Sequence, residues 1–170
     1  MDRYEGEYNG AALQSFLLAL GDSKPLIDRV LRNAGVDRID ADRWYEMNWA
    51  ASVYKAISDE LGRPVIVAVG RRMIDAAPFP PGINDVRDVL QSLDAAYRLS
   101  VRGPRTGAIT CTFDDDDTAT LHWATPGICA MNIGIIEGCC AKFGARALVE
   151  HGATGCAERG ASACIYRVTF

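Results

Sequence analysis

The chain has 170 residues, of which 49% are apolar and 24% charged; these proportions exclude a disordered or collagen-like polymer and predict a single domain, residues 1–170. Eighteen lysines and arginines against 22 aspartates and glutamates give a formal net charge of -4, so we expect no nucleic-acid partner. The sequence contains neither an apolar run long enough for a membrane span nor a signal-peptide pattern at its N-terminus, so we expect a cytoplasmic protein.

The first 103 residues are predicted to be helical. Glycines end the first three apolar segments, and Ser23, Asp40 or Asp42 can cap the helices that follow. Within the third segment, apolar side chains recur at spacings of three and four, which places them on one helix face: Trp44, Met47, Ala51, Tyr54, Ile57 and Leu61. The pattern predicts helices over the ranges 11–20, 24–34, 40–62, 63–76 and 84–101.

After Gly103 the hydrophobic period changes from helical to strand-like. Two alternating runs are joined by four aspartates, a helix opens after a Pro-Gly break, and two further strands lead to the C-terminus. The predicted ranges are strands 108–113 and 118–124, helix 129–143, and strands 145–151 and 163–170. The chain is therefore predicted to have an α+β fold, with a helical part, 1–103, packed on a small antiparallel sheet formed by a ββαββ unit, 104–170.

Six cysteines are many for a cytoplasmic domain, and five of them follow residue 128. In a reducing compartment, clustered thiols are typical of metal ligands or of small buried apolar residues. Cys139 and Cys140 lie in the middle of the predicted helix and Cys111 lies in a strand, so we interpret these three as buried structural thiols.

The other three cysteines lie where the predicted elements begin or turn. Cys129 opens the helix, and Cys156 and Cys164 flank a turn before the last strand. Glu150 and His151 end the preceding strand, so all these residues can meet at one end of the unit. Thiolate and imidazole are ligands that tetrahedral zinc prefers. The spacing indicates either a closed structural zinc site or a group of buried thiols.

The same segment resembles the 4-vinyl reductase domain, a small-molecule-binding module related to heme-NO-binding domains and to TRAPP transport-complex subunits. The motifs that carry the resemblance are a cysteine opening a helix with two glycines four apart, a Phe-Gly pair, a strand end, and two cysteines around a glycine turn. They read CAMNIGIIEG (129–138), FG (143–144), VEH (149–151) and CAERGASACIYRV (156–168). The N-terminal segments GAALQSFLLAL and WYEMNW also resemble longer bacterial members of this family.

The resemblance implies a TRAPP-like ligand-binding fold and a zinc ion held by Cys129, Cys156 and Cys164. Members that sense aromatic hydrocarbons supply a strand-end glutamate as the fourth ligand, three residues before the paired cysteines, where this chain has Ala153. We therefore expect His151 to complete the site, with Glu150 as the alternative.

The resemblance also implies an apolar pocket between the helical part and the sheet. The aromatic residues that we expect to contribute are Trp44, Tyr45, Trp49, Tyr54 and Tyr97; their alternative role is core packing. A heme or another tetrapyrrole is allowed by the relation to heme-NO-binding domains. Such a domain would take its axial histidine from a helix before the sheet, and the helical part has none, so we do not expect His122 to be a heme ligand.

These observations predict a non-catalytic sensor that binds a small apolar or aromatic molecule, carries structural zinc and forms a homodimer. Because no output domain is recognisable, its signal would pass to a separate protein. Two alternatives remain at this stage. One is an enzyme of tetrapyrrole metabolism or a tetrapyrrole-binding accessory protein, although no acid-base pair or nucleotide motif is visible. The other is a structural scaffold whose cavity holds a lipid.

Overall fold

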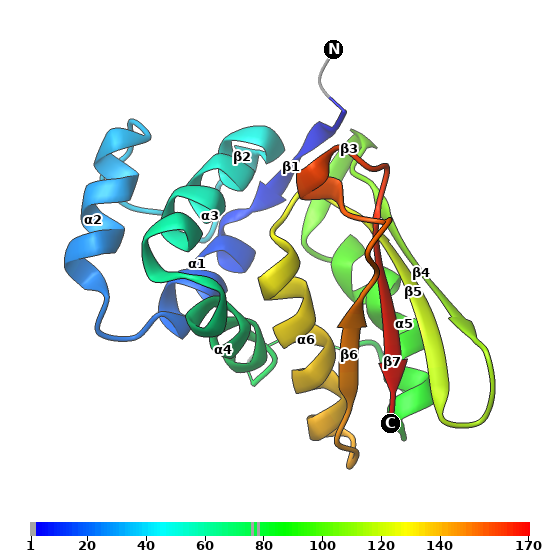
Figure 1. The fold of residues 1–170 in the computed structure, drawn as a ribbon. Helices are drawn as coiled ribbons and strands as arrows, with labels where there is room; N and C mark the ends of the chain where they lie inside the picture. The colour runs from blue at the N-terminus through cyan, green and yellow to red at the C-terminus, as the bar shows by residue number, and fades with distance from the viewer. Residues whose placement is uncertain (1–2, 76, 78) are drawn as a thin grey trace.

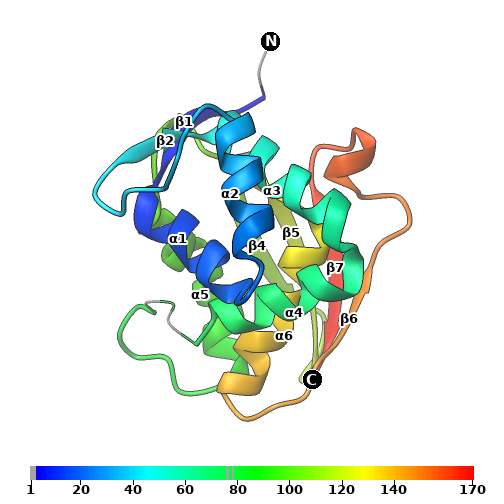
Figure 2. The same ribbon diagram turned by 90° about the vertical axis from the view of Figure 1, so that its left-hand side faces the viewer.

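A computed structural model describes residues 3–75, 77 and 79–170. The described residues form six α-helices and seven β-strands, which confirms the predicted α+β class. Helices α1 to α4 form one side of the molecule, a four-stranded sheet forms the other, and α6 lies between them (Figure 1). Figure 2 shows the helical side, with the sheet behind it. Among the described residues no helix combines the length and apolar character that a bilayer crossing requires.

Five helices precede the four-stranded sheet in the chain. Side-chain caps define the starts of three of them: Asn9, Glu46 and Asp85 accept hydrogen bonds from backbone amides in the first turns of α1, α3 and α5. Their bounds are Gly10–Ala19 (α1), Lys24–Asn33 (α2), Met47–Leu61 (α3), Arg63–Met73 (α4) and Val86–Arg98 (α5). The predicted end of the fourth helix, Ala76, lies outside the described residues.

Three strands within the part predicted to be helical form a separate antiparallel sheet. They are β1 (Glu5–Asn9), β2 (Trp44–Glu46) and β3 (Val101–Arg105), in the order β2-β1-β3. The prediction of a wholly helical part over residues 1–103 is therefore wrong in these segments. The strands are short and largely polar, and their partners are distant in sequence, so hydrophobic periodicity gave no signal for them.

The third helix begins later than its apolar spacing indicates. Trp44 and Tyr45 belong to β2, which pairs with β1, and not to the helix. The Glu46 carboxylate accepts hydrogen bonds from the amides of Asn48 and Trp49, at 2.8 and 2.7 Å. This cap satisfies two amide groups of the first turn and so starts α3 at Met47.

The second sheet contains the C-terminal strands. It consists of β4 (Ala108–Phe113), β5 (Thr118–Ala124), β6 (Leu148–His151) and β7 (Cys164–Thr169), antiparallel in the order β4-β5-β7-β6. Helix α6 (Cys129–Lys142) connects β5 to β6, and a 3₁₀ turn (Ala157–Arg159) precedes β7. Along β5, Leu121 and Trp123 are buried beneath the helices, whereas His122 between them is exposed. His122 therefore lies on the outer face of the sheet.

Helix α6 is buried between the sheet and α4, and glycines allow α4 to approach it closely. A Cβ added to Gly134 would lie 2.0 Å from the carbonyl oxygen of Val67 and 2.9 Å from Cα of Gly70. A Cβ on Gly70 would lie 2.3 Å from the carbonyl oxygen of Met131. These glycines therefore pack α4 against α6 within one chain, and they are not free to form a contact between subunits.

The close approach predicts that Gly134→Ala destabilises the protein although alanine favours helix formation. The added methyl group meets backbone atoms that cannot rotate away, so we expect the free energy of unfolding to fall by about 2–3 kcal/mol. Gly127→Ala is the matched control, because its Cβ would meet only side-chain atoms at ordinary contact distances, Met131 Cε at 3.5 Å and Asn132 Oδ1 at 3.7 Å. Chemical denaturation measures both variants, and equal stabilities of Gly134→Ala and wild type would contradict the packing argument.

Candidate functional site

Four predicted ligand residues meet at the end of the four-stranded sheet. Cys129 is the first residue of α6, His151 is the last of β6, Cys156 precedes the 3₁₀ turn and Cys164 begins β7. One ligand atom from each lies within 4.8 Å of the others. The Cys129 sulfur lies 3.2 Å from that of Cys164 and 3.5 Å from that of Cys156. The fold thus gathers residues that are up to 35 positions apart in the sequence.

These separations suit a tetrahedral metal ion. Zinc–sulfur bonds of about 2.3 Å at tetrahedral angles place two sulfur atoms about 3.8 Å apart. The observed sulfur separations are a few tenths of an ångström shorter, so a small outward movement of the side chains would admit an ion. Three sulfurs and one imidazole nitrogen form a zinc donor set, and four protein ligands leave no open position for a reacting water.

The histidine ring already has the orientation that a metal ligand needs. His151 Nδ1 lies 3.0 Å from the carbonyl oxygen of Gly152, a contact that favours a proton on Nδ1. Nε2 is then left with a lone pair, and this atom is buried without a hydrogen-bond partner among the described residues. An unpaired buried nitrogen destabilises a protein unless something binds it. A metal ion held with the three sulfurs would satisfy it.

Hydrogen bonds join the Cys129 sulfur to the sulfurs of Cys156 and Cys164. A hydrogen bond from Cys129 lowers the pKa of the Cys164 thiol to about 4, and the amide of Ala157 also donates to the Cys164 sulfur. The pKa of Cys129 is raised, first because it donates to Cys164 and second because it is buried. The cluster therefore presents a thiolate at neutral pH, and thiolate is the form of cysteine that binds metal.

A groove of about 420 Å³ opens beside the cluster, and two arginines, Arg63 and Arg159, line it. Three thiolates, one neutral imidazole and Zn²⁺ would carry a net charge of about −1, which nearby guanidinium groups would partly offset. Glu158 also lines the groove, and its carboxylate accepts a hydrogen bond from the amide of Cys129 at 3.3 Å. Sequence analysis missed these three residues. Glu158 and Arg159 lie in a short turn without a periodic signal, and Arg63 opens α4, which only the tertiary fold brings to the cluster.

The alternative ligand Glu150 lies away from the cluster. It precedes His151 in β6, so strand alternation turns its side chain to the opposite face, where it is exposed and pairs in register with Arg167. The same alternation turns His151 inward. Of the two residues considered as the fourth ligand, only His151 belongs to the cluster.

An apolar cavity of about 320 Å³ lies between the helical part and the sheet. Its wall is mainly hydrophobic, with a few polar groups, and its volume falls within the range of small-molecule sites. Residues from β1, α1, α3, α4, α5, β4, β5 and α6 and from the segment after α4 line it. They include Tyr8, Tyr54, Met73, Phe79, Leu93, Tyr97, Trp123, Asn132 and Ile135. The cavity thus lies where the two hydrophobic cores of the protein meet.

Two of the five predicted pocket aromatics line this cavity, namely Tyr54 and Tyr97. Trp44, Tyr45 and Trp49 lie elsewhere. The Tyr45 and Trp49 rings stack at 5.3 Å, and the indole N–H of Trp49 donates to the carbonyl of Ala34. Tyr45 and Trp49 therefore join β2 to α3 and α3 to the end of α2, whereas Trp44 packs under the Arg102 guanidinium of β3.

Sequence analysis did not identify Asn132 or Trp123 as cavity residues. Both come from the C-terminal unit, whereas the aromatic residues expected to line the pocket all belong to the part predicted to be helical. The signal in the sequence is a lone asparagine among apolar residues of a helix that is apolar all round. Asn132 is only 3% exposed, and a buried polar side chain in such a helix has a specific partner.

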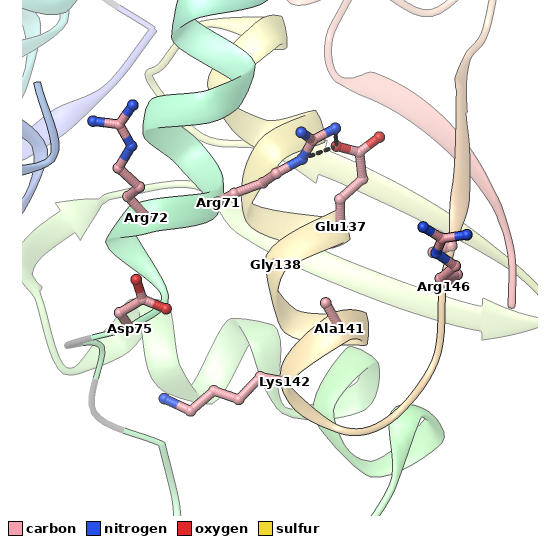
Figure 3. Close-up of a pocket in the computed structure, with 9 residues that line it drawn as sticks. Arg71, Arg72, Asp75, Glu137, Gly138, Ala141, Lys142 and Arg146 are labelled. Atoms are coloured by element: carbon pink, nitrogen blue, oxygen red, sulfur yellow. Dashed lines mark hydrogen bonds and ion pairs between the residues drawn. The ribbon is translucent and has the colours of Figure 1, made fainter.

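A second hollow lies on the surface where α4 and α6 end (Figure 3). Arg71, Arg72, Lys142 and Arg146 line it together with Asp75 and Glu137. An ion pair of 2.7 Å joins Arg71 to Glu137, and Lys142 donates to the carbonyl of Ile74. Basic side chains here complement the negative ends of two helix dipoles, which accounts for their presence without a ligand.

Comparison with models of protein families and with curated proteins found no match. Solved structures of H-NOX proteins share the fold. An oxygen-binding H-NOX domain related to soluble guanylate cyclases has 17% sequence identity, a TM-score of 0.70 and coverage of 95% of this chain and 94% of its own. An H-NOX protein from S. oneidensis in the Fe(II)NO state has 13% identity, a TM-score of 0.68, and coverage of 94% and 97%. A third, from a study of heme distortion in the H-NOX family, has 16% identity, a TM-score of 0.73, and coverage of 95% and 94%.

The residues of this chain do not fit a histidine-ligated heme. The two histidines lie on the outer face of β5 and in the cysteine cluster, and neither lines the cavity. Tyrosine and cysteine are other heme ligands in their anionic forms. Burial raises the pKa of Tyr54 and raises that of Cys139 to about 12, so both cavity residues are neutral near pH 7. The H-NOX fold is therefore present without a histidine for heme ligation at the cavity.

The half-buried Cys111 should show a displaced pH dependence of alkylation. Burial raises the pKa of this thiol to about 11, so it stays protonated at neutral pH. Its alkylation rate should rise about tenfold per pH unit up to about pH 11, whereas an ordinary thiol levels off near pH 8.5. Mass spectrometry of the peptide that carries Cys111 measures the alkylation rate. A rate that levels off near pH 8.5 would contradict the raised pKa of this thiol.

Proposed function

We propose that this protein is a non-catalytic sensor domain that binds a small apolar or aromatic molecule and carries a structural zinc ion. The observation that carries the proposal is the 320 Å³ apolar cavity between the helical part and the sheet. Its few polar groups can orient a ligand, and no acid-base pair suited to catalysis lies among its lining residues. The fold is shared with H-NOX domains, one of which is described as oxygen-binding.

The zinc ion would be held by Cys129, His151, Cys156 and Cys164. The donor set, the sulfur separations and the unpaired Nε2 of His151 support this part of the proposal. Zinc would connect the start of α6 to β6 and β7, and so stabilise one end of the molecule. Its role is structural, because all four positions would be occupied by protein ligands.

Signalling by such a domain requires that the ligand bind one conformation more tightly than another. We propose that the change passes to a separate output protein and that the domain acts as a homodimer. Native mass spectrometry gives the stoichiometry directly.

A tetrapyrrole-dependent function is less well supported because neither histidine lines the cavity. An absorption spectrum of freshly purified protein distinguishes a tetrapyrrole-binding protein from the proposed zinc-containing sensor, since a tetrapyrrole is coloured and the zinc form is colourless.

Protein purified under reducing conditions should contain one zinc ion per chain. Replacing Cys129, Cys156 or Cys164 by serine should remove the zinc, because each change deletes one ligand. Cys139→Ser is the matched control: Cys139 is equally buried but lies outside the cluster. Elemental analysis and native mass measure the metal content. Wild-type protein that stays folded without metal, and binds none when zinc is added, would refute the site.

Partly filling the cavity should weaken ligand binding. Ala96 lines the cavity from α5, and its neighbour Ala95 is exposed on the same helix. We expect Ala96→Leu to weaken binding of a cavity probe, cyclohexanol, by about tenfold or more, because the added side chain occupies part of the space. Ala95→Leu should bind as the wild type does. Isothermal calorimetry measures both, and unchanged binding by Ala96→Leu would place the ligand elsewhere.

A further inference from the structure

A buried hydrogen-bond chain joins the cavity to the cysteine cluster. Asn132 lines the cavity, and its Nδ2 donates to the hydroxyl oxygen of Tyr166 at 3.2 Å. The Tyr166 hydroxyl in turn donates to the backbone carbonyl of Cys129 at 3.4 Å. Asn132 is 3% exposed and Tyr166 is fully buried, so water does not compete for these bonds. Two hydrogen bonds thus connect the cavity wall to a metal-ligand residue.

The Tyr166 ring makes a second connection through packing. Its ring centre lies 4.9 Å from that of His151, edge to face, and 6.2 Å from that of Trp123. Trp123 belongs to the cavity wall, and His151 belongs to the cluster. A movement of Tyr166 would therefore be felt on both sides, because closely packed side chains transmit displacement.

The direction of the hydrogen bonds determines which ligand group suits the cavity. The Tyr166 hydroxyl has one proton, and in donating it to Cys129 it must accept from Asn132. The Asn132 amide therefore presents its N–H side to Tyr166, and its Oδ1 accepts no hydrogen bond from the described residues. A ligand hydroxyl or amine could donate to Oδ1 without disturbing this arrangement.

We propose that cavity occupancy and metal affinity are coupled through Asn132 and Tyr166. A ligand that donates to Asn132 Oδ1 fixes the amide, keeps the Tyr166 hydroxyl on the Cys129 carbonyl and tightens metal binding. A ligand that only accepts can take the second N–H of Nδ2, because the amide carries two such protons and Tyr166 uses one. It leaves Oδ1 without a donor, so it fixes the amide less firmly and has a smaller effect on metal binding. This inference rests on the proposed function, because it needs both a cavity ligand and a bound metal.

The coupling is tested with two cavity probes of nearly equal shape, cyclohexanol, which donates, and cyclohexanone, which only accepts. Trp44→Phe and Trp49→Phe leave Trp123 as the single tryptophan, so its fluorescence reports binding in the cavity. Each dissociation constant is measured with zinc bound and after chelation. Removing zinc should weaken cyclohexanol binding about fivefold or more and should change cyclohexanone binding by a smaller factor. By reciprocity, cyclohexanol should tighten zinc binding by the same factor.

Tyr166→Phe should reduce the dependence on zinc to the part carried by ring packing, since it removes the hydroxyl but keeps the ring against His151. Tyr97→Phe is the matched control. Tyr97 also lines the cavity, but its hydroxyl donates to the carbonyl of Thr106, away from the cluster. This variant can alter the affinity for the probes, but the ratio of the dissociation constants with and without zinc should stay as in the wild type.

Cobalt-substituted protein provides a second readout if chelation unfolds the chain. Cyclohexanol should shift the cobalt–thiolate absorption bands more than cyclohexanone does in the wild type, and both shifts should be smaller in Tyr166→Phe. Probe binding that is unaffected by zinc, together with unchanged cobalt bands, would overturn the coupling and leave the proposed function intact. Zinc-loaded protein that binds neither probe would refute the proposed function itself.

Discussion

The structure depends on the enclosure of α6 between α4 and the four-stranded sheet. Nine residues of this helix are buried, which explains why its sequence is apolar on all sides. Close approach of α4 requires glycine at 70 and 134, since a methyl group at either position would overlap backbone atoms. Because α6 is held on both sides, the side chains it presents to the cavity and to the cluster have fixed positions.

Both candidate sites are built on this helix. Its first residue, Cys129, belongs to the cysteine cluster, and three residues later Asn132 reaches the cavity. The hydroxyl of Tyr166, from β7, contacts both residues. A helix that is rigidly packed yet shared by two sites is suited to link them, because displacement at one end is transmitted along it.

The shared fold with H-NOX domains does not by itself determine the chemistry of the cavity. Neither histidine of this chain lines the cavity, and burial raises the pKa values of Tyr54 and Cys139 further above neutral pH. One of the two histidines instead lies among three sulfurs, with an unpaired nitrogen directed at them. A fold fixes where a cavity lies, whereas the residues that line it fix which ligand it can hold.

The sequence by itself determined the α+β class, the bounds of β4 and β5, and the set of residues able to bind metal. Hydrophobic periodicity and cysteine chemistry are local properties, so they can be read along the chain. Only the tertiary structure decided that His151 rather than Glu150 joins the cysteines, because strand alternation against the packed face sets the direction of each side chain. It also decided the three-stranded sheet and the cavity wall, which depend on contacts between distant segments.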